Sequence, residues 1–128
     1  MARIRSEDTV PEMLVRKMLH AAGFRFRLHR GDLPGKPDIV LPRYKVAIFV
    51  HGCFWHGHES CRDGRRPKSN LDYWNRKLDR NRERDRRSQA KLEAIGWRPL
   101  VVWECELEDP DQLLLRLTAE IGTTDARD

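Results

Sequence analysis

The fold is decided by residues 37–51, which read PDIVLPRYKVAIFVH. Two segments of strand length lie within this stretch, at 38–41 and 46–50, and Pro42-Arg-Tyr44 separates them as a turn. The second segment contains no polar residue, as is typical of a strand that is buried on both faces. The sequence therefore predicts a β-hairpin in which residues 46–50 form a central strand.

The residues before this hairpin predict one helix and one strand. Thr9 and Glu12 have the spacing of a capping box with Thr9 as N-cap, and apolar residues then recur at helical spacing until Gly23 ends the helix. Residues 24–28 alternate between apolar and polar side chains, which predicts a half-buried strand. A loop over residues 29–37 leads back to the hairpin.

The residues after the hairpin predict a long helix, a strand and a final helix. Ser69 or Asn70 is expected to cap the long helix, which runs to about Ile95. The side chains expected to face the core from it are Leu71, Trp74, Leu78, Asp85 and Leu92. Residues 97–103 predict a strand, and Asp109-Pro110 is a favourable start for a last helix that ends at Ile121.

This order of elements predicts an α/β fold in which helices flank a mixed central β-sheet. The length suits a single domain, residues 1–128, with loose ends at 1–7 and 122–128. Lys and Arg number 25 against 20 Asp and Glu, and the stretch from Arg76 to Arg87 is especially basic. The formal net charge of +5 favours a polyanionic partner such as nucleic acid.

The sequence contains no stretch that resembles a signal peptide and no apolar run long enough to span a bilayer. A cytoplasmic location and no membrane partner are therefore expected. In that reducing compartment three cysteines are not expected to form a disulfide framework, so metal binding or plain burial are the alternatives.

A segment rich in His and Cys follows the hairpin and reads HGCFWHGHESC at residues 51–61. The residues that could converge on a metal are Cys53, His58, Cys61 and Cys105. Four Cys and His ligands with no open position are typical of structural zinc. The alternative is that the cysteines are buried as small hydrophobic residues. His51 and His56 would remain for proton transfer or phosphate contact, unless they are ordinary surface histidines or alternative zinc ligands.

Asp38 stands at the head of the hairpin's first strand, directly after Pro37. Pro-Asp before a strand is the first half of the nuclease motif PD…(D/E)xK, whose carboxylate binds a hard cation such as Mg²⁺. The second half of the motif is missing, because the next strand ends in Phe49-Val50-His51 without another acid or a Lys. By itself the half-motif is weak evidence, and a structural turn aspartate is the favoured interpretation of it.

Together these motifs resemble those of the very-short-patch repair (Vsr) mismatch endonucleases, and the resemblance covers roughly residues 3–115. The matching stretches are DTVPE at 8–12, LPGKPDIV at 33–40, IFVHGCFWH at 48–56, ERDRR at 83–87, and GW through VWEC at 96–105. The resemblance implies a restriction-endonuclease-like core of the PD-(D/E)xK type with a structural zinc site.

The resemblance also implies roles for the catalytic residues. Asp38 would bind a catalytic Mg²⁺ together with the backbone carbonyl of Val50, a position where the family commonly has Thr. His56 would be the general base or its close partner, and His51 would contact the scissile phosphate. Glu12 would orient the metal-bound water, unless it serves only in the capping box.

The zinc ligands that the resemblance implies are the same Cys53, His58, Cys61 and Cys105. One more residue separates His58 from Cys61 than is usual in the family. The implied DNA contacts are three aromatic residues that wedge into the duplex, Phe54, Trp55 and Trp74, and three basic residues that meet phosphates, Arg84, Arg86 and Arg87. A wedge selects a mismatch because unstacking costs less there.

Each of these DNA contacts has a structural alternative. Phe54 or Trp55 could pack on the zinc loop, and Trp74 fits the buried stripe of the long helix. The basic helix could be a solvated helix with internal ion pairs, because Asp79, Glu83 and Asp85 are interleaved with its Arg residues.

The function implied is that of a monomeric, Mg²⁺-dependent enzyme that nicks one strand 5′ to the T of a T:G mismatch left by deamination of 5-methylcytosine. Its partners would be mismatched double-stranded DNA and general mismatch-repair proteins, and it would act at the bacterial nucleoid. One alternative is a Vsr-like nuclease of restriction or phage defence that acts on matched DNA. Others are a zinc-containing DNA-binding module without catalysis, and a structural zinc protein that does not bind DNA.

Overall fold

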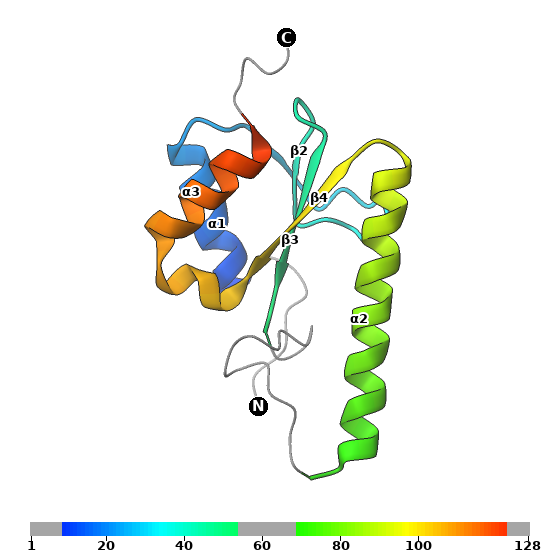
Figure 1. Cartoon of the computed structure of the whole chain (residues 1–128). Coiled ribbons are helices and arrows are strands. Elements are labelled where there is room, and N and C mark those ends of the chain that lie inside the picture. The colour runs from blue at the N-terminus through cyan, green and yellow to red at the C-terminus, as the bar shows by residue number, and fades with distance from the viewer. Residues whose placement is uncertain (1–8, 54–68, 123–128) are drawn as a thin grey trace.

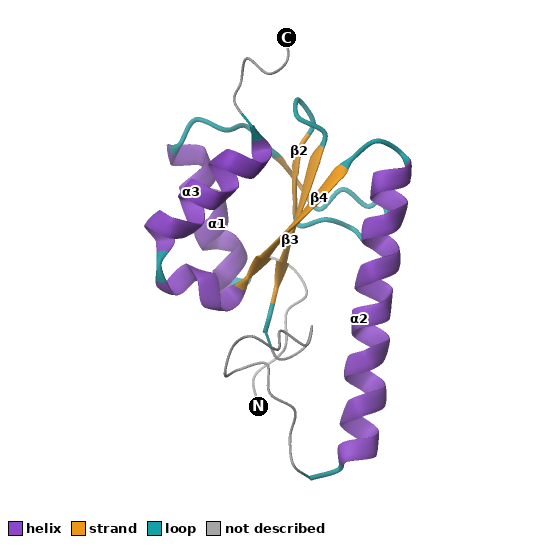
Figure 2. Cartoon of the chain, viewed as in Figure 1, coloured by secondary structure: helices purple, strands orange, loops and turns teal. Residues whose placement is uncertain are grey.

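The computed structural model describes residues 9–53 and 69–122, and its elements follow the predicted order (Figures 1 and 2). They are α1 (Val10–Ala21), β1 (Arg27–Leu28), β2 (Ile39–Leu41), β3 (Val46–His51), α2 (Leu71–Ala94), β4 (Arg98–Trp103), the 3-10 helix η2 (Glu104–Glu108) and α3 (Pro110–Ile121). Only η2 was not predicted. No helix within the described ranges combines the length and apolar character needed to cross a membrane.

The four strands form one mixed sheet in the order β1-β2-β3-β4. The hairpin is confirmed, because β2 and β3 pair antiparallel with Ile39 opposite Ile48. After β3 the chain crosses over through α2 and returns as β4, which pairs parallel to β3 with His51 opposite Trp103. This topology places the start of β2 and the ends of β3 and β4 at the same edge of the sheet.

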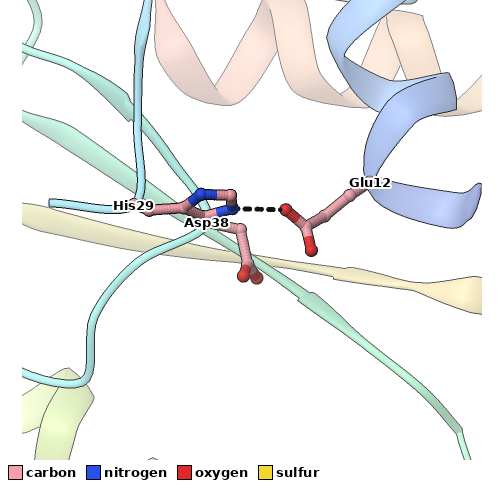
Figure 3. Close-up of side chains that lie close together, drawn as sticks. All are labelled: Glu12, His29 and Asp38. Carbon is pink, nitrogen blue, oxygen red and sulfur yellow. Dashed lines mark hydrogen bonds and ion pairs between the residues drawn. The ribbon is translucent and has the colours of Figure 1, made fainter. Parts of the chain in front are cut away.

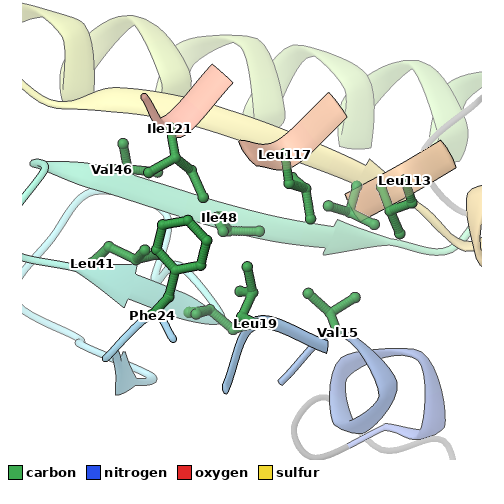
Figure 4. Close-up of a cluster of buried hydrophobic side chains, with 11 residues drawn as sticks. Val15, Leu19, Phe24, Leu41, Val46, Ile48, Leu113, Leu117 and Ile121 are labelled. Atoms are coloured by element: carbon green, nitrogen blue, oxygen red, sulfur yellow. The ribbon is translucent and has the colours of Figure 1, made fainter. Parts of the chain in front are cut away.

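Helices cover both faces of the sheet, with α1 and α3 on one side and α2 on the other (Figure 1). Figure 4 shows the larger core cluster, in which side chains from the sheet lie between α1 and α3. Its buried members are Val15, Leu19, Phe24, Ile39, Leu41, Val46, Ile48, Val102, Leu113, Leu117 and Ile121. The smaller cluster on the α2 face contains Leu33, Val40, Ala47, Phe49 and Leu92.

The unbroken apolar run of β3 follows from this layering. Val46 and Ile48 belong to the cluster beneath α1 and α3, whereas Ala47 and Phe49 belong to the cluster beneath α2. Successive side chains of a strand point to opposite faces, so a strand with helices on both sides needs apolar residues at every position. The prediction of a central strand is therefore confirmed.

The helix starts are set by local hydrogen bonds. The Thr9 hydroxyl accepts a bond from the Glu12 backbone N–H at 3.4 Å, and the Asp109 carboxylate accepts one from the Gln112 backbone N–H at 3.3 Å. Both residues are N-caps, as predicted. Gly23 follows the end of α1 with φ +97°, a conformation that glycine adopts without steric cost.

The strand predicted over residues 24–28 is wrong in extent, because only Arg27 and Leu28 pair with β2. Phe24 is buried in the core beside the ring of Tyr44, with 5.9 Å between the ring centroids, and lies outside the sheet. Phe24 is therefore apolar because its ring is buried in the core, and its place in the alternating pattern of residues 24–28 does not indicate a strand. The partner strand β2 is itself only three residues long, which limits the ladder.

The interpretation of α2 also needs correction at its start. Asn70 occupies the N-cap position with φ 54° and makes no side-chain cap bond, contrary to the prediction. Of the stripe predicted to be buried, only Leu78 and Leu92 are fully so, and Leu71 is half exposed. The reason is visible in Figure 1, where the first turns of α2 extend past the end of the sheet.

Candidate active site

A cleft of about 670 Å³ opens at the edge where β2 begins and β3 and β4 end. Its walls come from α1, the 29–38 loop, β3, α2 and η2. The residues that carry charge or polar chemistry in it are Thr9, Glu12, His29, Lys36, Asp38, His51, Arg84, Asp85, Ser88, Gln89 and Glu104. Segments far apart in the sequence thus meet around Asp38.

Asp38 is held through both its main chain and its side chain. Its carboxylate Oδ2 accepts a 2.8 Å hydrogen bond from the backbone N–H of Val50, and its own N–H donates to the Ile48 carbonyl at 3.0 Å. On the other side, its carbonyl accepts a bond from the His29 N–H at 3.3 Å. Asp38 directly precedes β2 and lines the cleft beside the end of the central strand β3.

Glu12 projects from the first turn of α1 and is 2% exposed. Its Oε2 lies 2.8 Å from Nε2 of His29 and 3.1 Å from Nη2 of Arg16. The capping-box interpretation is therefore only half right: Thr9 does cap the helix, but the carboxylate bonds to His29 and Arg16 instead. A buried carboxylate needs such partners, because it has given up its hydration.

Glu12, His29 and Asp38 form a compact cluster (Figure 3). Each of the three can present one ligand atom, and these atoms all lie within 4.8 Å of one another. Carboxylate oxygens are the ligands that Mg²⁺ prefers, whereas an imidazole nitrogen is more typical of transition metals. The Asp38 carboxylate is thus chemically suited to the catalytic cation that the sequence predicts, and Glu12 lies close enough to act on a water beside it.

His29 was not among the residues singled out from the sequence. A signal was available, because β1 pairs antiparallel with β2 and Leu28 lies opposite Ile39. Continuing that register by one residue places His29 beside Asp38. The approach of Glu12 to the same point depends on how α1 packs on the sheet, which no local pattern in the sequence describes.

His51 ends β3 and lines the cleft, while being only 5% exposed. Its ring contacts Trp103 edge-on, with centroids 5.2 Å apart, and lies 5.9 Å from the ring of Phe49. It is not an ordinary surface histidine. His56 lies outside the described residues, so its predicted role as general base stays a prediction.

Two of the four predicted zinc ligands are described. Cys53 is 2% exposed and Cys105 is half-buried. His51 and Trp103 are paired residues of β3 and β4, and each cysteine comes two residues after one of them along the chain. Neighbouring strands lie about 4.8 Å apart, so the chain brings both cysteines to the same edge of the sheet. His58 and Cys61 lie outside the described residues.

The predicted DNA contacts divide in the same way. Phe54 and Trp55 lie outside the described residues, whereas Trp74 is half-buried at the start of α2, with its ring edge-on to Tyr73 at 5.1 Å. Arg84 is exposed on α2 and lines the cleft. Arg87 is exposed as well and is not part of the cleft wall.

Arg86 makes the internal ion pair that the sequence left as an alternative. Its guanidinium donates to Glu83, and this hydrogen bond holds the pKa of the Glu83 carboxyl below its usual range. The pair is exposed, so it contributes little to stability. Arg84 is therefore the better placed of the two for a group that enters the cleft.

The comparison with protein families gives a direct match. Residues 1–62 match the family described as DNA mismatch endonuclease Vsr. The DNA mismatch endonuclease Vsr of Escherichia coli K12 is 41% identical over 113 residues, covering 88% of this chain and 72% of that protein.

Two further relatives are more similar in sequence. The Type II nicking enzyme V.XorIIP of Xanthomonas oryzae is 58% identical over 117 residues, covering 91% of this chain and 85% of that protein. The Type II nicking enzyme V.NmeAIP of Neisseria meningitidis is 50% identical over 124 residues, covering 94% of this chain and 88% of that protein.

The fold has a counterpart among solved structures. The catalytic domain of the homing endonuclease I-Bth0305I superposes with a TM-score of 0.57 and 22% sequence identity, over 86% of this chain and 91% of that domain. This likeness supports the restriction-endonuclease-like arrangement of a mixed sheet between helices. The sequence matches establish that the chain belongs to the Vsr family of DNA mismatch endonucleases and is a DNA endonuclease.

Proposed function

We propose that this chain is a Mg²⁺-dependent enzyme that nicks one strand of DNA 5′ to the T of a T:G mismatch and so starts very-short-patch repair. The observation that carries the proposal is the meeting of Glu12 and Asp38 in one cleft beside Arg84. Membership of the Vsr family, and relatives that are themselves named nicking enzymes, support it.

The cleft suits a phosphodiester group. Its walls combine carboxylates that can hold a cation with Arg84 and Lys36, which can meet phosphate oxygens. Arg84 belongs to the long basic helix α2, and a basic surface beside the cleft favours a polyanion through counterion release. A strand of duplex DNA could therefore lie along α2 with one phosphate in the cleft.

Asp38 and the backbone carbonyl of Val50 would hold the Mg²⁺, which supplies positive charge to the reacting phosphate. Glu12 would orient the attacking water, and His51 would contact the scissile phosphate. His56 would accept the proton from that water. The water oxygen forms a new bond to phosphorus as one P–O ester bond of the backbone breaks. The departing oxygen takes up a proton, so a hydroxyl and a phosphate are left at the nick.

Zinc would organise the loop that reads the mismatch. Cys53 and Cys105 at the sheet edge would bind it together with His58 and Cys61, and the closed ligand set makes the zinc structural. Phe54 and Trp55 would then wedge into the duplex from the same loop. A T:G pair is easier to unstack than a matched pair, so the energetic cost of the wedge becomes selectivity.

A monomer with one active site cuts one strand, which suits a nicking reaction. The nick would be passed to general mismatch-repair proteins, and the enzyme would work at the nucleoid in the cytoplasm. The T of the mismatch would come from deamination of 5-methylcytosine.

The proposal is tested by a nicking assay on T:G and matched duplexes, each labelled separately on its two strands, with Mg²⁺ or with EDTA. We expect wild type to nick only the T-containing strand of the T:G duplex, and only with Mg²⁺. Asp38→Ala should bind that duplex without nicking it. Asp32→Ala is the matched control, because Asp32 belongs to the same loop but is exposed and pairs with Arg30.

Three outcomes would overturn the proposal in different ways. If wild type nicks neither duplex, the proposed activity is wrong. If it cuts matched duplex as well as T:G duplex, a nuclease of restriction or phage defence is the better interpretation. If it binds DNA and Asp38→Ala changes nothing measurable, the chain is a zinc-containing binding module.

A further inference from the structure

His29 occupies an unusual position beside the proposed active site. It follows β1 directly and has φ 50°, a left-handed conformation that residues with a side chain rarely adopt. Its backbone N–H donates to the Asp38 carbonyl at 3.3 Å, so its main chain is tied to the head of β2. A strained residue anchored in this way is a candidate for a functional role.

The side chain of His29 reaches the carboxylate of Glu12. Nε2 lies 2.8 Å from Oε2, and the only other bond to this carboxylate from the described residues comes from Arg16, at 3.1 Å to the same Oε2. Nη2 of Arg16 also lies near this nitrogen, at 3.4 Å. A carboxylate oxygen can only accept, so we assign the proton to Nε2, the arrangement that satisfies the shorter contact with Glu12. The pair is well shielded, with the Glu12 side chain 2% exposed and that of His29 21% exposed.

Two donors on one oxygen fix the orientation of the carboxylate. Oε2 is occupied from the protein side by His29 and Arg16, and this leaves Oε1 for a group in the cleft. Figure 3 shows this second oxygen turned away from the imidazole. Arg16 belongs to the same helix as Glu12, four residues on, whereas His29 belongs to the loop that leads to Asp38.

We propose that His29 is a positioning residue, which fixes the Glu12 carboxylate relative to Asp38 so that Oε1 faces the attacking water. The proposal rests on the proposed function, because it assumes that Glu12 acts on water at that site. His29 is the one partner of Glu12 that connects α1 to the Asp38 loop through both its side chain and its main chain. His29 therefore sets the distance between the carboxylates of Glu12 and Asp38. Neither α1 nor the hairpin can fix that distance alone, because each carries only one of the two carboxylates.

The structural alternative is that His29 is itself a metal ligand, since its ring lies within reach of both carboxylates. A metal would need the lone pair of Nε2, whereas the contact with Glu12 uses the proton on that atom. The two roles predict opposite results for a substitution that keeps the donor. The amide nitrogen of Gln can replace Nε2 of His as a donor, and Asn is too short to do so.

The experiment compares His29→Ala, His29→Gln and His29→Asn with wild type on the T:G duplex. His20→Ala serves as the matched control, because His20 is exposed in the last turn of α1 outside the cleft. We expect His29→Ala and His29→Asn to lower kcat by about 10- to 100-fold, which is typical for groups that orient a catalytic residue. His29→Gln should recover most of kcat, and KM should stay within about two-fold throughout because uniform binding is unaffected.

Two further readouts separate positioning from metal binding and from a general loss of structure. Mn²⁺ titrated into the DNA-free proteins and followed by electron paramagnetic resonance should bind all variants with affinity within about two-fold of wild type, because the proposed ligands, Asp38 and the Val50 carbonyl, are unchanged. In a Glu12→Gln background His29→Ala should cost less than about two-fold in kcat, since residues that act as a unit are not additive.

The inference is overturned if His29→Ala or His29→Asn nicks at the wild-type rate, or if their losses are unchanged in the Glu12→Gln background. It is also overturned if His29→Gln loses both Mn²⁺ affinity and activity, which would make His29 a ligand. Should His29→Ala fail to fold, the Gln and Asn variants decide alone, because both keep a polar side chain at this partly exposed position. These outcomes presuppose Asp38-dependent nicking by wild type; if wild type does not nick, the proposed function fails instead.

Discussion

The carboxylate of Asp38 accepts a 2.8 Å hydrogen bond from the backbone N–H of Val50, so the acid at the head of β2 is fastened to the end of β3. The antiparallel hairpin brings these two residues together, and the same hairpin forms the centre of the sheet. The site and the fold therefore depend on one another, and substitutions can separate the two contributions.

Substitution of Asp38 by Asn should separate chemistry from structure. The Asn amide oxygen can still accept the bond from Val50, whereas Ala leaves that N–H without its partner at a cost of about 1–3 kcal/mol. We expect Asp38→Asn to unfold in urea near the wild-type midpoint and Asp38→Ala to unfold earlier. Both should lose more than about 100-fold in nicking rate, because a metal-binding carboxylate contributes several kcal/mol to the transition state. Wild-type nicking by Asp38→Asn would argue against a metal at this carboxylate.

Gly35 is predicted to be essential for the close packing of α2 against the 29–38 loop. A Cβ there would lie 2.7 Å from Cβ of Ser88 and 3.1 Å from Cε1 of Phe49, and φ is +80°. Gly96 has φ +89° with nothing within 4 Å of an added Cβ. Gly96→Ala therefore measures only the free-energy cost of placing a residue with a side chain in the left-handed conformation. Gly96→Ala should lose about 1–2 kcal/mol of unfolding free energy, and Gly35→Ala about 1–3 kcal/mol more from the clash.

Chemical denaturation of the two glycine variants measures this difference. Equal losses for Gly35→Ala and Gly96→Ala would mean that the loop moves aside at no cost. Because Gly35 and Ser88 both line the cleft, Gly35→Ala should also lower nicking, whereas Gly96→Ala should not.

Two leucines of α3 provide a matched test of the core. Leu117 is fully buried beneath the sheet and Leu115 is 66% exposed, so the two share a helix but differ in burial. Leu117→Ala should lower the unfolding free energy by about 2–5 kcal/mol, because it removes buried methyl groups and leaves a cavity. Leu115→Ala should stay within about 0.5 kcal/mol of wild type. A reversed order in urea unfolding would contradict the packing of α3.

Arg84 and Arg86 should differ in their contribution to DNA binding. Arg84 lines the cleft, whereas Arg86 donates to Glu83 on the exposed surface of α2. Arg84→Ala should weaken binding to T:G duplex and reduce the slope of log K against log salt by about 1, the loss of one phosphate contact. Fluorescence anisotropy at several salt concentrations measures both, and a larger effect of Arg86→Ala would place the phosphate path elsewhere on α2.

The zinc proposal predicts both the zinc content of the purified protein and the effect of zinc removal on its thermal stability. Purified protein should contain about one zinc per chain by elemental analysis, and Cys105→Ala should lose it, because a closed site needs all four ligands. Removing the metal by chelation should lower the thermal midpoint of wild type but not of Cys105→Ala. Zinc-free wild type that melts at the same temperature would favour the other interpretation, in which the cysteines are buried as small hydrophobic residues.

Local patterns in the sequence were sufficient for most of the elements. The apolar run of β3, the N-caps Thr9 and Asp109, and the stop at Gly23 each depend on interactions among near neighbours, so they could be predicted. The predictions that were wrong concern residues whose structure depends on contacts distant in the sequence. Phe24, for example, packs beside Tyr44 instead of extending β1. The start of α2 failed for the same reason, since no sheet lies beneath its first turns.

The sequence by itself determined the family and the identity of the acid at the centre of the site, because both are carried by motifs of adjacent residues such as Pro37-Asp38 and residues 48–56. Only the tertiary structure decided that Glu12 turns from the helix cap to His29, and that His29 stands beside Asp38. The physical reason is that a buried carboxylate must find donors, and which donors lie within reach depends on how α1 packs against the hairpin. No spacing within one segment encodes that distance.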